Sequence, residues 1–163
     1  MDISDWVVII TGGGTGVGAA AAKMLAERGA KLVINYSRSA DEAQATAKEC
    51  EALGAETLVC QANVAEDADC KRMTEETMAK WGRIDGLMNN AGITTLVADN
   101  SLDALSADDF INIYSVNVVG AYQMTRAVAP HMKARGYGSI VNTSSIAGVM
   151  GIGSSIAYAV SKG

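Results

Sequence analysis

Short apolar runs alternate with longer helical stretches along this chain, and this alternation limits the possible folds more than any other feature. Runs of apolar residues without polar interruption suit strands that are covered on both faces, as in a parallel sheet. Repeated strand–helix units build such a sheet with helices on both of its faces. We therefore predict an α/β fold. The expected strands are Trp6–Ile10, Lys31–Asn35, Thr57–Gln61, Ile84–Met88 and Ser139–Thr143.

The stretches between these strands are predicted to be helices. The longest begins after Ser106, a typical N-cap residue, and runs to about Arg135. Asp108 and Asp109 place acids in its first turn, where they suit the helix dipole. Pro130 lies inside this helix and is expected to bend or break it. The other expected helices are Ala19–Arg28, Asp41–Leu53, Asp67–Trp81 and one that begins at Ser155.

The last predicted helix, Ser155–Gly163, has no strand after it. A crossover helix in a parallel sheet leads into a further strand. We therefore expect the 163 residues to be the N-terminal part of a longer single domain. Neither a repeat nor a linker divides the chain, so residues 1–163 are treated as one unit.

Composition and charge exclude several classes of protein. Hydrophobic residues make up 49% of the chain and charged residues 19%, which is typical of a globular domain and not of a disordered chain. The net charge of −5 argues against a nucleic-acid partner. The chain holds one histidine and three widely spaced cysteines, so no metal site is expected.

The cysteines and the apolar runs also bear on location. Cys50, Cys60 and Cys70 are sparse and odd in number, which fits a reducing compartment. The sequence shows neither a signal-peptide pattern nor an apolar run of membrane length. We therefore expect a cytoplasmic protein without a membrane partner.

Glycines fill the loop from Thr11 to Gly18, between the first predicted strand and the first predicted helix. Glycine permits a tight turn and lets backbone N–H groups approach a pyrophosphate, whose charge the helix N-terminus favours. A flexible turn without a ligand is the alternative interpretation. The strand–loop–helix context favours a dinucleotide site.

The end of the second predicted strand is expected to select the cofactor. An acid at this position would hold the ribose 2′-hydroxyl of NAD, but the segment contains none. Ser37 and Arg38 instead offer a hydroxyl and a guanidinium that can hold the 2′-phosphate of NADP. The sequence therefore predicts NADP(H), with NAD(H) as the alternative; a solvated arginine without a ligand is the simpler interpretation of Arg38.

Candidates for the chemistry follow the fourth and fifth strands. Tyr158 and Lys162 are four residues apart, on one face of the last helix. An ammonium group stabilises tyrosinate, so Tyr158 could exchange a proton with a carbonyl oxygen. A surface pair without function is the alternative. The segment Asn89–Gly92 ends the fourth strand at the sheet edge where ligands bind, although it could also be a plain turn.

Two other polar residues complete this set. The hydroxyl of Ser145 follows the fifth strand and could polarise a carbonyl group, and Ser144 is a rival for this role. Asn117, on the long helix, could hold a water that relays protons to Lys162, or it could simply be a polar packing residue.

These motifs together resemble the short-chain dehydrogenase/reductase family, and most of all its 3-oxoacyl-carrier-protein reductase-like branch. The resemblance implies a Rossmann-type doubly wound parallel sheet whose visible strand order is 3-2-1-4-5. It also implies two further strands and a substrate lid beyond the residues given. The matching pieces are Thr11–Gly18, Asn63-Val64, Asn89–Gly92, Asn117, Ser145, Tyr158 and Lys162.

The resemblance also implies roles for single residues. Tyr158 would be the catalytic acid and base, Ser145 would position the substrate carbonyl, and Asn117 would complete a water relay. Lys162 would support Tyr158 and hold the nicotinamide ribose. The other expected cofactor-binding residues are Gly12, Thr15, Gly16, Val17 and Gly18 in the loop, Ser37 and Arg38 at the 2′-phosphate, Asn63 and Val64 beside the adenine, and Asn90, Ala91 and Gly92 along the groove.

One residue departs from the family pattern. Thr15 stands where many NADP-preferring members have a basic residue, so the expected phosphate site depends on Arg38. The implied function is oxidation or reduction of a carbonyl/alcohol pair, with a small ketone or a 3-oxoacyl thioester as substrate. The alternatives are an NAD-dependent alcohol or polyol dehydrogenase and a non-catalytic NADP(H)-binding module. We expect the full-length protein to be a homo-oligomer, a dimer or a tetramer.

Overall fold

A five-stranded parallel sheet forms the centre of the molecule in a computed structural model that describes residues 2–97 and 101–163. The strand order is β3-β2-β1-β4-β5, as predicted, and all four neighbouring pairs are parallel. The carboxyl ends of the strands therefore meet at one edge. The strands are β1 (Val7–Ile10), β2 (Lys31–Tyr36), β3 (Thr57–Gln61), β4 (Gly86–Asn89) and β5 (Ser139–Asn142).

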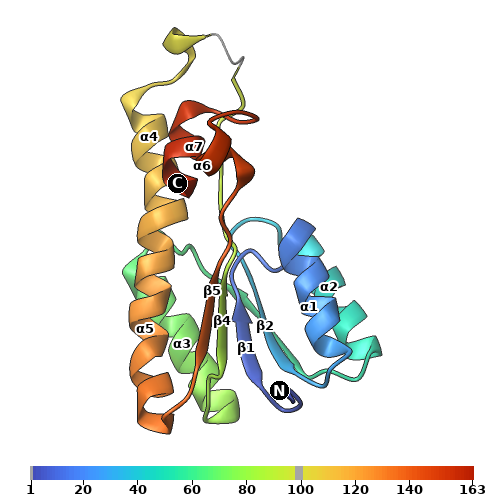
Figure 1. The fold of residues 1–163 in the computed structure, drawn as a ribbon. Coiled ribbons are helices and arrows are strands. Elements are labelled where there is room, and N and C mark those ends of the chain that lie inside the picture. Colours follow the sequence, from blue (N-terminus) through green and yellow to red (C-terminus); the bar gives the residue numbers. More distant parts are fainter. Residues whose placement is uncertain (1, 98–100) are drawn as a thin grey trace.

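Helices cover both faces of the sheet (Figure 1). The first face carries α1 (Gly16–Ala26) and α2 (Ala40–Ala52). The other carries α3 (Asp67–Trp81) and α5 (Gly120–Arg135). Beyond the carboxyl edge lie two short helices, α6 (Ile146–Met150) and α7 (Ile156–Lys162). The remaining elements are η1 (Leu102–Ala104), α4 (Ala107–Tyr114) and the π-helical segment η2 (Ser115–Val119).

The core has two parts because successive side chains of a strand point to opposite faces. Ile9 packs toward α3 and α5, in a cluster that also contains Met73 and Val128. Ile10 packs toward α1 and α2, in a cluster that also contains Ala47. All four residues of β1 are buried, as expected for the central strand of a sheet covered on both faces.

The long helix is interrupted, but not at Pro130. Helix α5 continues through Pro130 to Arg135, so the expectation of a break at the proline was wrong. Pro130 is exposed, and the carbonyl that loses its donor can be satisfied by water there. The interruption lies earlier, where η2 replaces α-helical geometry between α4 and α5. The five-residue helix α6 was not predicted.

No helix within the described ranges is long and apolar enough to cross a membrane.

A buried carboxylate joins the elements at the amino edge of the sheet. The Asp85 side chain is 1% exposed and accepts hydrogen bonds from the Val7 N–H (2.9 Å) and from Nε and Nη2 of Arg83 (2.8 Å each). Nη2 of Arg135, at the end of α5, lies 3.4 Å from the same carboxylate. Burial opposes ionisation, but these hydrogen bonds and guanidinium charges outweigh it and hold the pKa of Asp85 below its ordinary value.

We predict that Asp85→Ala lowers the free energy of unfolding by about 3 kcal/mol, because it removes one partner of a buried ion pair. Since the folded state lowers the pKa of Asp85, the stabilisation is complete above the ordinary aspartate pKa of about 3.9 and is lost as the pH falls below it. Urea denaturation at several pH values measures both effects. Asp41→Ala, an exposed control, should change stability by less than about 1 kcal/mol. Equal stability of Asp85→Ala and the wild type would contradict this role.

Candidate functional site

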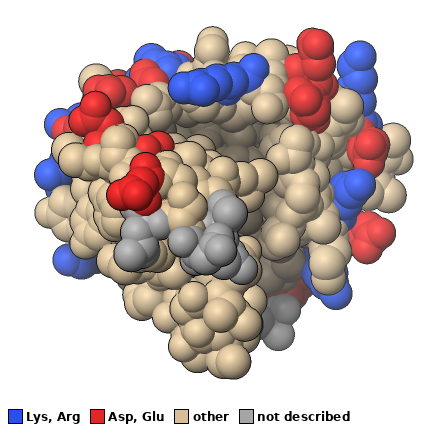
Figure 2. Space-filling view, turned by 90° about the horizontal axis from the view of Figure 1, so that it is seen from above, with Lys and Arg blue, Asp and Glu red and all other residues tan. Residues whose placement is uncertain are grey.

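A groove of about 750 Å³ runs along the carboxyl edge of the sheet. The glycine-rich loop after β1 and the segment after β2 form one side, and residues of α4 and η2 form the other. Figure 2 shows that this end of the molecule is hollowed, with basic side chains along one rim. Ligands of open α/β sheets bind outside the carboxyl ends of their strands, so this groove is the candidate binding site.

Two asparagines hold the glycine-rich loop in shape. Asn35 Oδ1, at the end of β2, accepts a hydrogen bond from the Gly12 N–H at 3.1 Å. Asn90 Nδ2 donates to the carbonyl oxygens of Thr11 and Gly12, both at 3.1 Å. Thr11 Oγ1 in turn accepts from the N–H groups of Asn90 and Ala91 at 3.0 Å. The loop after β1 is thereby fastened to the ends of β2 and β4.

Two glycines are required here for different reasons. Gly12 has φ +61°, and a Cβ on it would lie 3.0 Å from the Cα of Ala91. Gly18 lies in the first turn of α1, where a Cβ would lie 2.4 Å from the Gly12 oxygen and 2.7 Å from Asn90 Nδ2. The loop can therefore fold tightly against the strand ends only without side chains at these positions, which leaves backbone open to a ligand.

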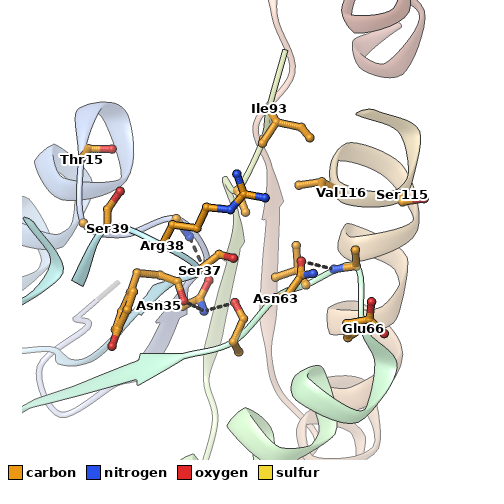
Figure 3. Close-up of a pocket in the computed structure, with 18 of the residues that line it drawn as sticks. Thr15, Asn35, Ser37, Arg38, Ser39, Asn63, Glu66, Ile93, Ser115 and Val116 are labelled. Carbon is orange, nitrogen blue, oxygen red and sulfur yellow. Dashed lines mark hydrogen bonds between the residues drawn. The ribbon is translucent and has the colours of Figure 1, made fainter. Parts of the chain in front are cut away.

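Polar side chains gather where β2 ends. Ser37, Arg38 and Ser39 line the groove and are exposed, and Thr15 faces them from the loop before α1. Figure 3 shows the Arg38 guanidinium pointing into the cavity, toward Ile93 and Val116 on the opposite wall. None of the carboxylates in the described ranges forms an ion pair with Arg38. Its charge is therefore available to an anionic ligand.

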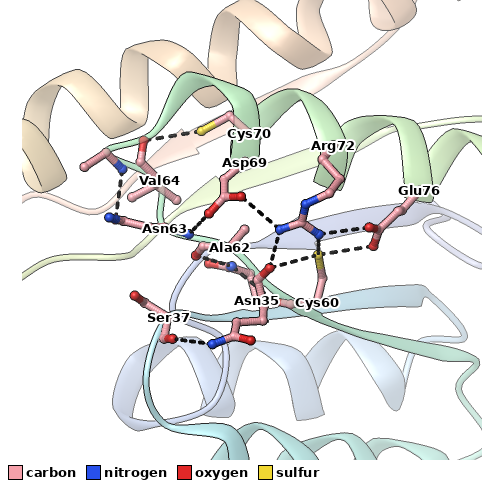
Figure 4. Close-up of polar contacts among 12 residues, drawn as sticks. Asn35, Ser37, Cys60, Ala62, Asn63, Val64, Asp69, Cys70, Arg72 and Glu76 are labelled. Atoms are coloured by element: carbon pink, nitrogen blue, oxygen red, sulfur yellow. Dashed lines mark hydrogen bonds and ion pairs between the residues drawn. The ribbon is translucent and has the colours of Figure 1, made fainter.

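The end of β3 forms the floor of the groove and is tied to α3 (Figure 4). Asp69 Oδ2 accepts from the Asn63 N–H at 2.7 Å, and Arg72 Nη2 donates to the Gln61 oxygen at 2.6 Å. The Asn63 N–H, followed by Arg72, keeps the pKa of Asp69 below its ordinary value. The oxygen of the buried Val64 accepts from Gln123 Nε2 at 2.8 Å. Asn63 and Val64 are thus held as rigid parts of the wall.

Lys162, the last residue of α7, places its charged group close to the groove wall at Gly92. Its Nζ donates to the Thr143 oxygen at 2.8 Å and lies 6.0 Å from the centre of the Tyr158 ring. A Cβ on Gly92, which lines the groove, would lie 3.5 Å from this Nζ. Burial lowers the pKa of Lys162 below its ordinary value.

The structure gives Ser144 and Ser145 different partners. Ser144 Oγ donates to the Lys162 carbonyl oxygen at 2.7 Å, so its proton is used inside the protein. Ser145 Oγ accepts from the Ala147 N–H at 3.2 Å as the N-cap of α6, and its proton remains available to a substrate. The described chain shows no hydrogen bond between the side chains of Ser145 and Tyr158.

Asn117 is buried at the centre of η2. Its Oδ1 accepts from the Ile93 N–H at 2.8 Å, and its Nδ2 donates to the Ile93 oxygen at 3.0 Å and to Ser161 Oγ at 2.8 Å. Both amide protons are therefore used. A water relay at this residue would have to use an acceptor atom of Asn117, because the side chain has no free donor.

The predicted site residues fall into three groups. Gly12, Thr15, Ser37, Arg38, Asn63, Val64, Ala91 and Gly92 line the groove. Gly16, Val17, Gly18 and Asn90 do not line it: Gly18 and Asn90 support the loop from behind, and Val17 is 62% exposed. Asn117 and Lys162 line a second hollow of about 460 Å³ between α5, β5 and α7, and Ser145 and Tyr158 line neither hollow.

Sequence reasoning missed the role of Asn35. The sequence predicts only that no acid stands at the end of β2. In the structure, the amide of Asn35 points inward and donates to the oxygens of Cys60 (3.2 Å) and Ala62 (3.0 Å). An asparagine directly after the apolar run Leu32–Ile34 was the available signal. Ser39, Ile93 and Val116 were also missed as lining residues, because they lie outside the recognised motifs.

Comparisons with known proteins agree with this architecture. A family model described as short chain dehydrogenase matches residues 6–163. The chain is 40% identical to a protein named as a ketoacyl reductase of the granaticin polyketide synthase in Streptomyces violaceoruber, covering 96% of this chain and 61% of the relative. It is 35% identical to a 3-oxoacyl-acyl-carrier-protein reductase of Staphylococcus epidermidis, covering 94% of this chain and 62% of the relative.

A solved structure shares the fold. NAD⁺-bound xylitol dehydrogenase superposes with a TM-score of 0.91 at 31% identity, covering 99% of this chain and 61% of that structure's chain. The present chain thus spans about three-fifths of the length of these relatives.

We predict that Gly18→Ala weakens NADPH binding at least tenfold, or by about 1.4 kcal/mol, because the new methyl group would displace the Gly12 oxygen and Asn90. Fluorescence titration with NADPH measures the affinity. Gly54→Ala is the control: Gly54 has φ +92° and open space around it, so alanine there should lower stability by about 1–2 kcal/mol and leave affinity unchanged. An affinity for Gly18→Ala equal to that of the wild type would show that the loop does not hold the cofactor.

Proposed function

The chain belongs to the short-chain dehydrogenase family, and from this premise we propose that it transfers a hydride between NADP(H) and a carbonyl or alcohol substrate. The observation that carries the proposal is the junction at Gly92. This residue lines the cofactor groove, and a Cβ on it would lie 3.5 Å from Lys162 Nζ and 3.4 Å from Asn117 Oδ1. Lys162 and Asn117 therefore lie directly behind the groove wall at Gly92.

Each reactive residue of the chain would have its own role in the reaction. Tyr158 would donate a proton to the carbonyl oxygen during reduction and accept it back during oxidation. The Lys162 ammonium would stabilise tyrosinate and contact the nicotinamide ribose, and Ser145 would donate a hydrogen bond to the same carbonyl oxygen. A bound nicotinamide supplies or accepts the hydride. Asn117 would hold a water that relays protons to Lys162.

The residues of the groove fit a dinucleotide. The tight loop at Gly12 leaves backbone for a pyrophosphate, and Arg38 offers an unpaired guanidinium for the 2′-phosphate of NADP. Asp41 and Glu42 occupy the first turn of α2, so the phosphate would depend on Arg38 and the hydroxyl of Ser37 instead of the helix end. This arrangement supports NADP(H) as the cofactor.

An NAD-dependent alcohol or polyol dehydrogenase is the second candidate. The likeness to NAD⁺-bound xylitol dehydrogenase favours it. The end of β2 argues against it, because the Asn35 side chain there is hydrogen-bonded within the protein and no acid is present for a ribose 2′-hydroxyl. A non-catalytic NADP(H)-binding module is less well supported, since it would not need Ser145, Tyr158 and Lys162 together.

The surroundings of the reactive residues favour a neutral, apolar ketone over a polyol. Lys162 is the one charged residue between Gly136 and Gly163. Large apolar side chains are exposed next to Ser145, among them Ile146 (70%) and Val149 (80%) on α6. Apolar surface of this kind binds hydrocarbon and offers few partners to hydroxyl groups. An acyl chain or a cyclic ketone fits this description.

Cellular location and assembly are part of the same proposal. The three buried free cysteines support a cytoplasmic protein. Apolar and aromatic side chains exposed along α4 and α5, including Ile111 (62%) and Tyr122 (61%), support association into a homo-oligomer.

We predict that NADPH binds at least tenfold more tightly than NADH, or by about 1.4 kcal/mol, and that Arg38→Asp reverses this preference. The aspartate would repel the 2′-phosphate and accept a hydrogen bond from a ribose hydroxyl. Calorimetric titration with both cofactors measures the ratio. Arg28→Asp makes the same charge change at the end of α1 and should leave the ratio unchanged. Equal affinities for the two cofactors in the wild type would refute the assignment to Arg38.

We predict that Tyr158→Phe lowers kcat by about 10²–10⁴-fold, because the variant keeps the ring and loses the proton donor. NADPH affinity should hardly change. Lys162→Ala should impair both kcat and cofactor affinity, since Lys162 would serve both. Steady-state reduction of a neutral ketone provides the measurement, with Tyr137→Phe as the control, since Tyr137 packs against Trp6 and lines neither hollow. Near-normal turnover by Tyr158→Phe would remove Tyr158 from the mechanism.

A further inference from the structure

Ser161 lies where α7, which carries Tyr158 and Lys162, meets η2, which carries Asn117. It is buried, it directly precedes Lys162, and it is on the last turn of α7. Its Oγ donates to the Tyr158 carbonyl oxygen at 2.7 Å and accepts from Asn117 Nδ2 at 2.8 Å. One hydroxyl therefore contacts both Asn117 and the peptide unit of Tyr158.

The direction of every hydrogen bond in this chain of groups is fixed. Asn117 Oδ1 must face the Ile93 N–H, because the opposite orientation would place two donors against each other. The amide nitrogen then faces the Ile93 oxygen and Ser161 Oγ. Since Ser161 accepts from Asn117, its own proton goes to the Tyr158 oxygen. The chain Ile93–Asn117–Ser161–Tyr158 thus has a single arrangement.

Helix α7 needs such an anchor. It has seven residues, well below the roughly 12–15 residues at which isolated helices become even marginally stable. Its other side-chain anchors include the Ser155 N-cap and two hydrogen bonds near β5. Ser144 Oγ donates to the Lys162 oxygen, and Lys162 Nζ donates to the Thr143 oxygen. Ser161 provides the side-chain hydrogen bond that joins α7 to η2.

The π-helical geometry of η2 suits the contact between Asn117 and Ser161. A π turn holds one more residue than an α turn, and one residue corresponds to about 100° of rotation around the helix. In the observed geometry, Asn117 faces both Ile93 and Ser161.

From this arrangement we propose that Ser161 is a positioning residue, which fixes the turn that carries Tyr158 relative to the groove wall by linking its peptide unit to Asn117. The inference rests on the proposed function. Ile93 lies next to Gly92 in the groove wall, so the link reaches from the wall to the turn that carries the phenol. Ser161 touches neither substrate nor cofactor in this role and acts through Tyr158 and Asn117.

The test compares Ser161→Ala with Ser161→Thr, which keeps the hydroxyl. We expect Ser161→Ala to lower kcat at least about tenfold while KM and NADPH affinity stay within about twofold, and Ser161→Thr to recover most of the loss. Thr77→Val is the matched control, because Thr77 Oγ1 is also buried and donates to a helix carbonyl, that of Met73, at 2.7 Å. This control should lose stability without losing kcat.

A double-variant cycle separates positioning from a general loss of stability. If Ser161 acts through Asn117, the variant with both residues changed to alanine should be no slower than Asn117→Ala alone. Multiplying losses, or an unchanged kcat in Ser161→Ala, would overturn the proposal.

A measurement without turnover distinguishes failure of this inference from failure of the proposed function. In nuclear magnetic resonance spectra, Ser161→Ala should speed solvent exchange of the Asn117 side-chain amide and shift the Tyr158 backbone signals. If the wild type binds no NADPH and reduces no ketone, the proposed function fails, and the spectra then decide the link alone. Unchanged Asn117 and Tyr158 signals would overturn the positioning role.

Discussion

The side-chain amide of Asn35 is the interaction on which the binding edge of this sheet depends. It accepts from the Gly12 N–H and donates to the oxygens of Cys60 and Ala62, so it joins the ends of β1, β2 and β3. Asn90 extends the same fastening to β4. A parallel sheet leaves the polar groups at its strand ends without partners, and these amides satisfy them. The glycine-rich loop keeps its tight shape because both of its sides are held in this way.

The amino edge and the carboxyl edge of the sheet have different roles. At the amino edge, the buried carboxylate of Asp85 ties β1 to the end of α5, and its main-chain oxygen accepts from the Ser139 N–H of β5, which contributes to stability. At the carboxyl edge, neutral amides and hydroxyls hold the glycine-rich loop and α7, and Asp69 and Arg72 hold the end of β3. Arg38 and Lys162 are cations at the two parts of the proposed site. The anchors near the reactive residues are thus mainly uncharged. Charge in this region is available to the ligands.

The pattern of apolar runs was enough to predict the strands to within one or two residues, and the family resemblance supplied their order in the sheet. Short-range patterns could not predict the π segment at Asn117, because a turn with one extra residue leaves the apolar pattern nearly unchanged. The helix does not break at Pro130, because at an exposed position water can satisfy the carbonyl that loses its N–H donor. The roles of Asn35, Asp85 and Ser161 depend on partners far away in the sequence, and these become visible only once the chain is folded.

Hydride transfer at the carboxyl edge is the central claim, and isotope labelling tests it most directly. NADPH carrying deuterium at C4 of the nicotinamide, prepared separately in its two diastereomers, would be supplied with a neutral cyclic ketone in ordinary water. The account predicts that mass spectrometry finds one deuterium in the alcohol from one diastereomer and none from the other. Alcohol that is unlabelled from both diastereomers, or labelled equally by both, would contradict it.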